Sequence, residues 1–313
     1  MSENKIKVAA VVGPTASGKT KLGVMLAQAL NGEVVSADSM QIYQGMNIAS
    51  AKPTAEEMQG VPHHLISIIP QSEEFSAAKY VELAKKAILD ISGRGKLPVV
   101  VGGTGLYVDS LLNNIKFGET DIDETLRRSL FEKAEKEGAQ AVWDELNSFD
   151  PEAAANIEPN NVKRVIRAIE VFRTSGMTIT EHNRRSRLSP SPYDAVKIGL
   201  KTSDREILYK RINARADEMV SLGLLDEARE FLSDPMLGKT AKMAIGCKEL
   251  APYFEGSQTL EEALETLKRE TRRYAKRQLV WFKRDKSIHW FNTDEYGDFS
   301  QLADDCLKLF SGW

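Results

Sequence analysis

GPTASGKT, residues 13–20, is the stretch that decides the fold class of this chain. The pattern G-x-x-x-x-G-K-[ST] is met at every fixed position, and in this pattern backbone N–H groups and a lysine surround phosphate oxygens. The apolar run 7–12 precedes the stretch and the helical pattern 19–30 follows it, which is the context that the motif needs. A plain strand-to-helix turn would share this context but would not need the full motif. The sequence therefore predicts a phosphate-binding loop made of Gly13, Pro14, Thr15, Ala16, Ser17, Gly18, Lys19 and Thr20.

Individual residues of this loop have separate expected roles. Lys19 reaches the terminal phosphates, and the hydroxyl of Thr20 holds Mg²⁺. The helix that follows adds the partial positive charge of its N-terminus. Read alone, the loop suggests ATP as the ligand, but it does not name the phosphate compound.

The remaining pattern predicts a P-loop NTPase-like α/β fold, a parallel sheet flanked by helices. Short β-branched runs alternate with helical periodicity, as in parallel sheets. Ser203, with Glu206 three residues later, is expected to cap a long helix. The predicted strands are 33–36, 98–101, 194–200 and 287–292, and the predicted long helices are 74–91 and 261–284.

A change of pattern divides the chain into three parts. From 120 to 191 only helical segments follow one another, including 124–137 and 162–174, and period-2 alternation then returns. We therefore predict a P-loop core, first part (1–119), an all-helical insertion (120–191) and the second part of the core (192–313).

Bulk composition points to a globular, cytoplasmic protein. The chain has 313 residues, of which 42% are apolar and 28% charged. Cys247 and Cys306 lie far apart without a pairing motif, and neither a signal peptide nor a membrane-spanning run is apparent. We expect a monomer that does not associate with membranes.

Charge is distributed unevenly along the sequence, although the formal net charge is only −3. Residues 161–187, which end at Arg187, hold seven basic and two acidic side chains, and residues 268–286 hold nine basic and two acidic ones. Each segment is also typical of a solvated helix face with i,i+4 ion pairs. An acidic body with two basic segments nevertheless suggests a localised polyanion site.

The strand 98–101 does not end in the acidic Mg²⁺ partner that an ordinary P-loop kinase presents. It runs into Gly102-Gly103-Thr104, which offers a hydroxyl and flexible backbone. The available carboxylate is Asp38, after the neighbouring short strand. From position alone Asp38 is equally an indirect Mg²⁺ partner, a turn cap or a general base.

Several stretches together resemble the tRNA dimethylallyltransferases, also called tRNA isopentenyltransferases, in their bacterial form. The resemblance covers nearly the whole chain. The combination of SADSMQIY, GGTGLY and AKRQLVWF, which start at residues 36, 102 and 275, is specific to this family. The matching stretches are GPTASGKT from Gly13, SADSMQIYQGMNIASAKPT from Ser36, PHHLI from Pro62, GGTGLY from Gly102, RVIRAIEVFRTSG from Arg164, AIGCKEL from Ala244 and RRYAKRQLVWFKR from Arg272.

This resemblance implies transfer of a dimethylallyl group from dimethylallyl diphosphate to N6 of adenine 37, beside the anticodon of tRNA. The P-loop then holds the diphosphate as a leaving group, with Mg²⁺ as cofactor. Asp38 becomes the base that accepts the N6 proton, with Thr104 hydrogen-bonding nearby. Arg215 resembles the arginine that clamps the diphosphate, although Arg211 lies only four residues earlier.

The same resemblance implies contacts with the tRNA anticodon stem-loop. Extruding a stacked adenine costs about a few kcal/mol, which contacts elsewhere on the RNA must offset. The residues expected to make them are Asp38, Ser39, Met40, Gln41, Thr104, Arg127, Lys163, Arg164, Val165, Ile166 and Arg167. The helical spacing of the basic residues in 268–286 places Lys276 and Arg277 against phosphates as well.

Two positions depart from the family pattern. Cys247 stands where an aromatic residue is common, and Lys163 stands where glutamine is usual. Two other functions remain as alternatives, a small-molecule ATP-dependent kinase and a nucleotide-regulated RNA-binding protein without catalysis. The sequence lacks the acid-terminated strand that a kinase would need, and a non-catalytic RNA-binding protein would leave Asp38 and Lys19 without a role.

Overall fold

The structure is a computed structural model that describes residues 5–116, 123–186 and 188–313. The described residues divide into two compact units, one made of residues 1–112 and 192–313 and the other of residues 113–191. The helical unit thus starts before the predicted boundary at 120, which itself lies outside the described residues, as does Arg187.

The larger unit is built on a six-stranded sheet with the order β3-β2-β4-β1-β5-β6, in which every pairing is parallel. The predicted α/β class with a parallel sheet flanked by helices is confirmed. Its strands are β1 (Ile6–Val12), β2 (Gly32–Ser36), β3 (His63–His64), β4 (Leu97–Gly102), β5 (Tyr193–Lys201) and β6 (Ile288–Asn292).

Helices and 3₁₀ turns connect these strands. They are α1 (Lys19–Ala29), α2 (Ala55–Met58), α3 (Ala77–Gly93), α4 (Gly105–Leu112), α10 (Arg205–Ser221), α11 (Leu224–Ser233), η1 (Ala241–Met243), α12 (Ala251–Phe254), α13 (Leu260–Phe282), α14 (Phe299–Leu307) and η2 (Lys308–Phe310).

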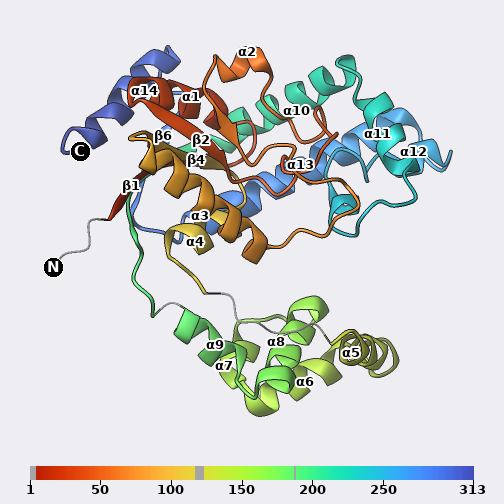
Figure 1. The fold of residues 1–313 in the computed structure, drawn as a ribbon. Helices are drawn as coiled ribbons and strands as arrows, with labels where there is room; N and C mark the ends of the chain where they lie inside the picture. The colour runs from red at the N-terminus through yellow and green to blue at the C-terminus, as the bar shows by residue number, and fades with distance from the viewer. Residues whose placement is uncertain (1–4, 117–122, 187) are drawn as a thin grey trace. The chain divides into compact units, whose positions relative to one another are not determined.

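The central strand β1 is buried on both faces, which explains its continuous apolar sequence. Ala9 and Val11 face a core shared with α1 and α14, whereas Val8, Ala10 and Val12 face a core shared with α3, α4, α11 and α13. Figure 1 shows α1 and α14 on one side of the sheet and α3 and α4 on the other. The sheet is therefore a middle layer between two layers of helices.

The smaller unit is helical throughout its described part and has its own core. It comprises α5 (Glu124–Glu137), α6 (Ala139–Phe149), α7 (Pro151–Ala155), α8 (Val162–Ser175) and α9 (Ile179–Ser186). Val142, Leu146, Val165 and Ile169 are completely buried at its centre. The 3.6-residue spacing of apolar side chains in α8 accounts for that burial.

The predicted cap of α10 is wrong. Asp204, not Ser203, accepts the hydrogen bond from the backbone N–H of Glu206 at 3.0 Å. Ser203 instead bonds Asp294, with its N–H 2.8 Å from Asp294 Oδ1. Helix α3 likewise starts at Ala77 and not at Glu74, because Ser76 caps it: its Oγ accepts from the N–H of Lys79 at 3.2 Å.

The register of three neighbouring strands places their functional ends together. Ser36 pairs with Val101 across β2 and β4, and Val12 pairs with Gly102 across β1 and β4. The carboxyl ends of the three strands therefore lie level at one edge of the sheet. Among the described residues, no helix is long and apolar enough to span a bilayer.

A buried carboxylate braces the first part of this sheet. Glu33 of β2 is 2% exposed, and its oxygens lie 2.5 and 2.7 Å from the Arg94 guanidinium and 2.8 Å from Lys96 Nζ. His64 Nε2 lies 2.7 Å from the same group. Hydrogen bonding to Arg94, first of all, holds the pKa of Glu33 well below its usual range.

We predict that Glu33→Gln lowers the free energy of unfolding at neutral pH by about 1–3 kcal/mol, because a buried charged acceptor is lost. The depressed pKa means that the stabilisation is present above the ordinary pKa of 4.5 and declines as the pH falls below it. Urea unfolding at several pH values checks this. A difference between wild type and variant that stays constant down to about pH 3 would contradict it.

Candidate active site at the carboxyl edge of the sheet

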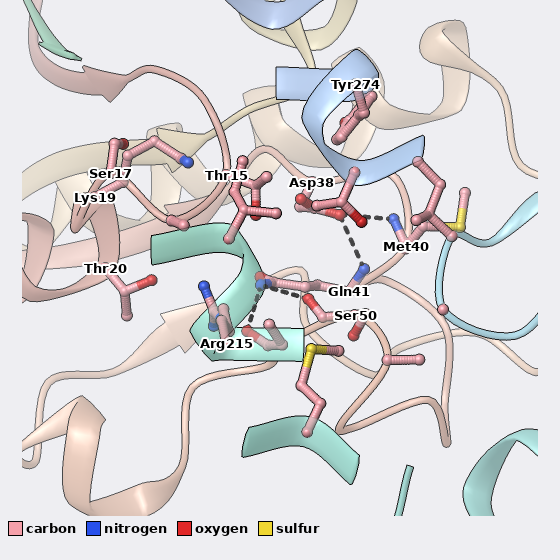
Figure 2. A pocket seen from close by; sticks show the side chains of 18 of the residues that line it. Thr15, Ser17, Lys19, Thr20, Asp38, Met40, Gln41, Ser50, Arg215 and Tyr274 are labelled. Carbon is pink, nitrogen blue, oxygen red and sulfur yellow. Dashed lines mark hydrogen bonds between the residues drawn. The ribbon is translucent and has the colours of Figure 1, made fainter. Parts of the chain in front are cut away.

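A cavity of about 660 Å³ opens at the carboxyl ends of β1, β2 and β4. One side carries the phosphate loop and α10, the other carries the segment after β2 and helix α13 (Figure 2). The lining includes Thr15, Ser17, Lys19, Thr20, Asp38, Gln41, Ala49, Ser50, Ala51, Arg215, Met219, Met243, Ile245, Leu267, Tyr274 and Gln278.

The phosphate loop has the compact geometry that its glycines predict. Gly18 has φ of 85° and a Cβ there would lie 2.3 Å from the Phe299 ring, so no side chain fits. Ser17 is fully buried, and its Oγ has no hydrogen-bond partner among the described residues. Buried hydroxyls are usually paired, so this oxygen and the adjoining helix N-terminus suit an anion in the cavity.

Two cations face this part of the cavity. Lys19 Nζ donates to Pro14 O at 2.6 Å, and burial lowers the pKa of its ammonium to about 8, with Asp38 raising and Arg215 lowering it. Arg215 makes no hydrogen bond or ion pair with the described residues, whereas Arg211 donates to Thr293 Oγ1 at 2.7 Å. Arg215 is therefore the arginine that is available for an anion.

Asp38 and Thr104 meet because β2 and β4 end level. The N–H of Ala37 donates to Val101 O, and the N–H of Thr104 donates back to Ala37 O. Thr104 Oγ1 accepts from the N–H of Ser39 at 3.0 Å, so the side chain of Thr104 is bound to the turn that contains Asp38.

The Asp38 carboxylate uses one of its oxygens as a turn cap. Oδ1 accepts from the N–H of Met40 at 2.8 Å and from that of Gln41 at 3.3 Å (Figure 2). Oδ2 accepts no hydrogen bond from any described residue. The structure thus assigns the cap role to one oxygen and leaves the other available to a ligand or a proton.

Two further residues of α13 border the site and were not predicted from the sequence. Gln278 is 5% exposed; its Oε1 accepts from the N–H of Thr15 at 2.8 Å, and its Nε2 donates to Gly103 O at 3.0 Å. Gln278 therefore ties the phosphate loop to the end of β4. Burial raises the pKa of Tyr274, against the effect of Thr104 and Gln278, so its phenol stays protonated beside Asp38.

The glycines after β4 supply the signal that could have revealed this contact. A Cβ on Gly103 would lie 2.2 Å from Gln278 Nε2, and one on Gly105 would lie 2.3 Å from the Trp281 ring. Glycine is required here because α13 packs directly on the backbone. Trp281 and Phe282 accordingly belong to the core of the larger unit.

Four of the predicted RNA-contacting residues are consecutive on α8, and they differ in exposure. Lys163 and Arg164 are exposed on α8, and among the described residues neither has an ion-pair partner. Val165 and Ile166 are 0% and 1% exposed. The prediction that these two contact RNA is therefore wrong for their side chains, because they form the core of the unit.

Arg127 and Arg167 share the buried carboxylate of Glu170. The Arg127 guanidinium binds it at 2.5 and 2.9 Å, and Arg167 lies 3.5 Å from it while remaining 44% exposed. The bidentate geometry occupies two N–H groups of Arg127 and raises its pKa through that bond. Arg127 thus holds α5 to α8.

On α13, Lys276 and Arg277 are both exposed, and neither forms an ion pair within the described part of the chain. The Arg277 guanidinium lies 5.8 Å from the Tyr274 ring centroid. Lys268 and Arg273 are instead paired with carboxylates at 2.8 and 2.6 Å. Cys247, which departs from the family pattern, is completely buried and contributes only to packing.

A family model described as IPP transferase matches residues 41–285. The chain belongs to the IPP transferase family. The tRNA dimethylallyltransferase of Halalkalibacterium halodurans is 51% identical over 308 residues, 98% of each chain. That of Bacillus licheniformis is 49% identical over 312 residues, 100% of this chain and 99% of the relative.

Solved structures are similar over the whole chain as well. The tRNA isopentenylpyrophosphate transferase from Bacillus halodurans has a TM-score of 0.74 and 47% identity, covering 98% of this chain and 96% of its own. A eukaryotic dimethylallyltransferase acting on tRNA has a TM-score of 0.79 and 30% identity, covering 95% and 75%. The predicted family resemblance is confirmed.

We predict that the affinity for inorganic pyrophosphate falls above about pH 8, by up to about tenfold per pH unit. Below this pH Lys19 is already charged, whereas above it the amine must take up a proton before it can attract the anion. Isothermal titration calorimetry between about pH 7 and pH 9.5 measures the slope.

Lys19→Arg is the matched control, because a guanidinium stays charged throughout this range. Titration of pyrophosphate itself affects both proteins equally. Identical slopes for wild type and Lys19→Arg would show that Lys19 does not titrate in the site.

Proposed function

We propose that this protein transfers a dimethylallyl group from dimethylallyl diphosphate to N6 of adenine 37 of tRNA, next to the anticodon, and releases diphosphate. One observation carries the proposal: Lys19 and Arg215 and an open carboxylate oxygen of Asp38 face the same cavity. The names of the relatives support the same reaction.

The cationic side of the cavity suits the leaving group. The allylic C–O bond breaks with its electron pair moving to the diphosphate, whose oxygens gain negative charge. Lys19 and Arg215 line this side of the cavity together with the phosphate loop, and their charges would stabilise the departing group. The residues stabilise a departing diphosphate and take no part in phosphoryl transfer.

Mg²⁺ would bind on the same side. It prefers oxygen ligands and is often held by one or two protein groups together with phosphate oxygens. Among the described residues, no cluster of three or more acidic, histidine or cysteine side chains could hold a metal unaided. Thr20 Oγ1 at the cavity wall fits the shared arrangement, in which Mg²⁺ would supply additional charge neutralisation when bound.

The opposite side of the cavity suits the nucleophile. The N6 lone pair forms the new C–N bond, and the proton that N6 loses goes to Asp38 Oδ2. Oδ1 remains bound to the backbone N–H groups of Met40 and Gln41, so the carboxylate keeps its orientation during the transfer. Tyr274 lines the cavity on this side and would orient the adenine edge, and Thr104, which accepts from the N–H of Ser39, would hold the turn of Asp38 in place.

Apolar side chains complete the wall between the two sides. Met219, Met243, Ile245 and Leu267 line the cavity, and they suit a five-carbon chain that carries no polar group. A small-molecule kinase would need neither this apolar wall nor the exposed cations of α13. Its expected acid at the end of β4 is replaced by Gly102 and Gly103.

Exposed cations on each unit suit the RNA. Lys163 and Arg164 in the helical unit and Lys276 and Arg277 in the larger unit are free of intramolecular ion pairs within the described residues. Their charges would neutralise phosphates of the anticodon stem-loop, and the binding energy would offset extrusion of the adenine.

We predict that Asp38→Asn lowers kcat for prenyl transfer by about 10²–10⁴-fold, the usual contribution of a general base. The amide oxygen of Asn can still accept from Met40 and Gln41, so the turn and tRNA binding should be preserved. Mass spectrometry of adenosine from unmodified tRNA, incubated with dimethylallyl diphosphate and Mg²⁺, measures the transfer. Equal losses of transfer and tRNA affinity would instead make Asp38 an RNA anchor.

We also predict that Lys276→Ala with Arg277→Ala weakens tRNA binding and reduces the salt slope by about 2, because two phosphate contacts are lost. Filter binding at several salt concentrations measures this slope. Lys79→Ala with Lys86→Ala, which removes two exposed cations of α3, is the control. An unchanged slope in the α13 variant would mean that this helix face is only solvated.

A further inference from the structure

A carboxylate outside the cavity binds three consecutive backbone N–H groups. Glu227 of α11 accepts from Asn47 at 2.6 Å, from Ile48 at 2.9 and 3.0 Å and from Ala49 at 2.7 Å. Successive N–H groups that converge on one anion form a charge-assisted set, and such bonds are stronger than neutral ones. The segment 47–49 belongs to no helix or strand, and this carboxylate holds all three of its backbone N–H groups.

The anchored segment continues directly into the cavity wall. Ala49, Ser50 and Ala51 line the cavity, and Ala51 has φ of 51°, in the left-handed region that favours glycine. Such a backbone persists only where the surrounding structure holds it. The position of this part of the wall thus depends on contacts from outside it.

A short chain of hydrogen bonds links the wall to Asp38. Gln41 Nε2 donates to Ser50 O at 3.4 Å and to Ala51 O at 3.1 Å. The backbone N–H of Gln41 donates to Asp38 Oδ1. Displacing the carbonyl groups of residues 50 and 51 would therefore move Gln41 and, through it, the Asp38 carboxylate.

Close packing on the opposite side leaves the segment no room. A Cβ on Gly246 would lie 3.1 Å from Ala49 Cβ, and the N–H of Gly246 donates to Glu249 Oε2 at 2.9 Å. Lys52 Nζ also donates to the carbonyl groups of Tyr43 and Gly45 within the same loop. The wall is thus held from two sides, and Glu227 provides the attachment to α11.

We propose that Glu227 is a positioning residue for the reaction, acting through the segment 47–51 and Gln41 on Asp38. It touches no reacting atom. The kinetic part of this inference rests on the proposed function, whereas the structural link from Glu227 to Asp38 does not.

The structural link is tested by amide hydrogen exchange in the whole protein. In Glu227→Ala, exchange at Asn47, Ile48 and Ala49 should rise by at least about tenfold, because three charge-assisted bonds are lost. Exchange at Met40 and Gln41, whose N–H groups bind Asp38, should rise as well. Glu230→Ala, which removes an exposed carboxylate from the same helix, should leave all these rates unchanged.

The kinetic consequence is tested with the same variants. Glu227→Ala should lower kcat for prenyl transfer by about tenfold or more when assayed well below its Tm, with tRNA affinity matching that of Glu230→Ala. Glu227→Gln retains one acceptor oxygen but loses the charge, so its kcat should lie between those of wild type and Glu227→Ala. This partial rescue would not follow from a general loss of stability.

Each result decides the inference. Wild-type kcat in Glu227→Ala, or unchanged exchange at Met40 and Gln41, would overturn it. If Glu227→Ala does not fold, Glu227→Gln decides, and normal kcat with normal exchange in that variant would overturn it. If the wild type transfers no prenyl group, the proposed function fails, and exchange at Met40 and Gln41 still tests the link to Asp38.

Discussion

Parallel pairing of β2 and β1 with β4, with all three strands ending level, is the constraint on which the site depends. It places the phosphate loop after Val12 and the turn of Asp38 after Ser36 around one cavity, and it places the Thr104 hydroxyl, two residues after Gly102, against that turn. A shift of one residue in this register would turn each side chain to the other face of the sheet. Burial of β1 and β4 on both faces opposes such a shift, because every apolar side chain already has a core position.

Contacts from distant helices then set the shape of the cavity. Gln278 of α13 joins the phosphate loop to the end of β4, and Glu227 of α11 holds the wall at residues 47–49. Cations collect on one side and the Asp38 carboxylate lies on the other, so charge is separated before any ligand binds. In a partly desolvated cavity this separation favours an ionising C–O bond on one side and loss of a proton on the other.

Local patterns in the sequence predicted much of this arrangement. The phosphate-loop motif, the alternation of strands and helices, and the helices 124–137 and 162–174 follow from short-range periodicity, and the structure has them within a residue or two. Gln278 and Glu227 could not be found in that way, because their partners are distant in sequence. Gln278 binds a residue 263 positions away, and Glu227 binds residues about 180 positions away. In the sequence only Gly103 and Gly105 indicate that α13 packs on the end of β4. Why glycine is needed at these positions is visible only in the structure.

Side-chain competition explains the predictions that were wrong. Val165 and Ile166 lie between basic residues in sequence, but the helix turns them into the core of the smaller unit. Ser203 matched a capping pattern, yet Asp294 binds it and Asp204 caps the helix. The predicted RNA contact of Arg127 stays a prediction, and two of its N–H groups are held by Glu170, a pairing that sequence spacing does not reveal.

The central claim is that the phosphate loop stabilises a departing diphosphate. Dimethylallyl diphosphate labelled with ¹⁸O at the oxygen between the allylic carbon and phosphorus tests it directly, with the products analysed by mass spectrometry after incubation with unmodified tRNA. Cleavage of the C–O bond predicts that all of the label is found in diphosphate, with one diphosphate released per prenylated adenosine. Label in dimethylallyl alcohol, or release of orthophosphate without prenylated adenosine, would contradict the account.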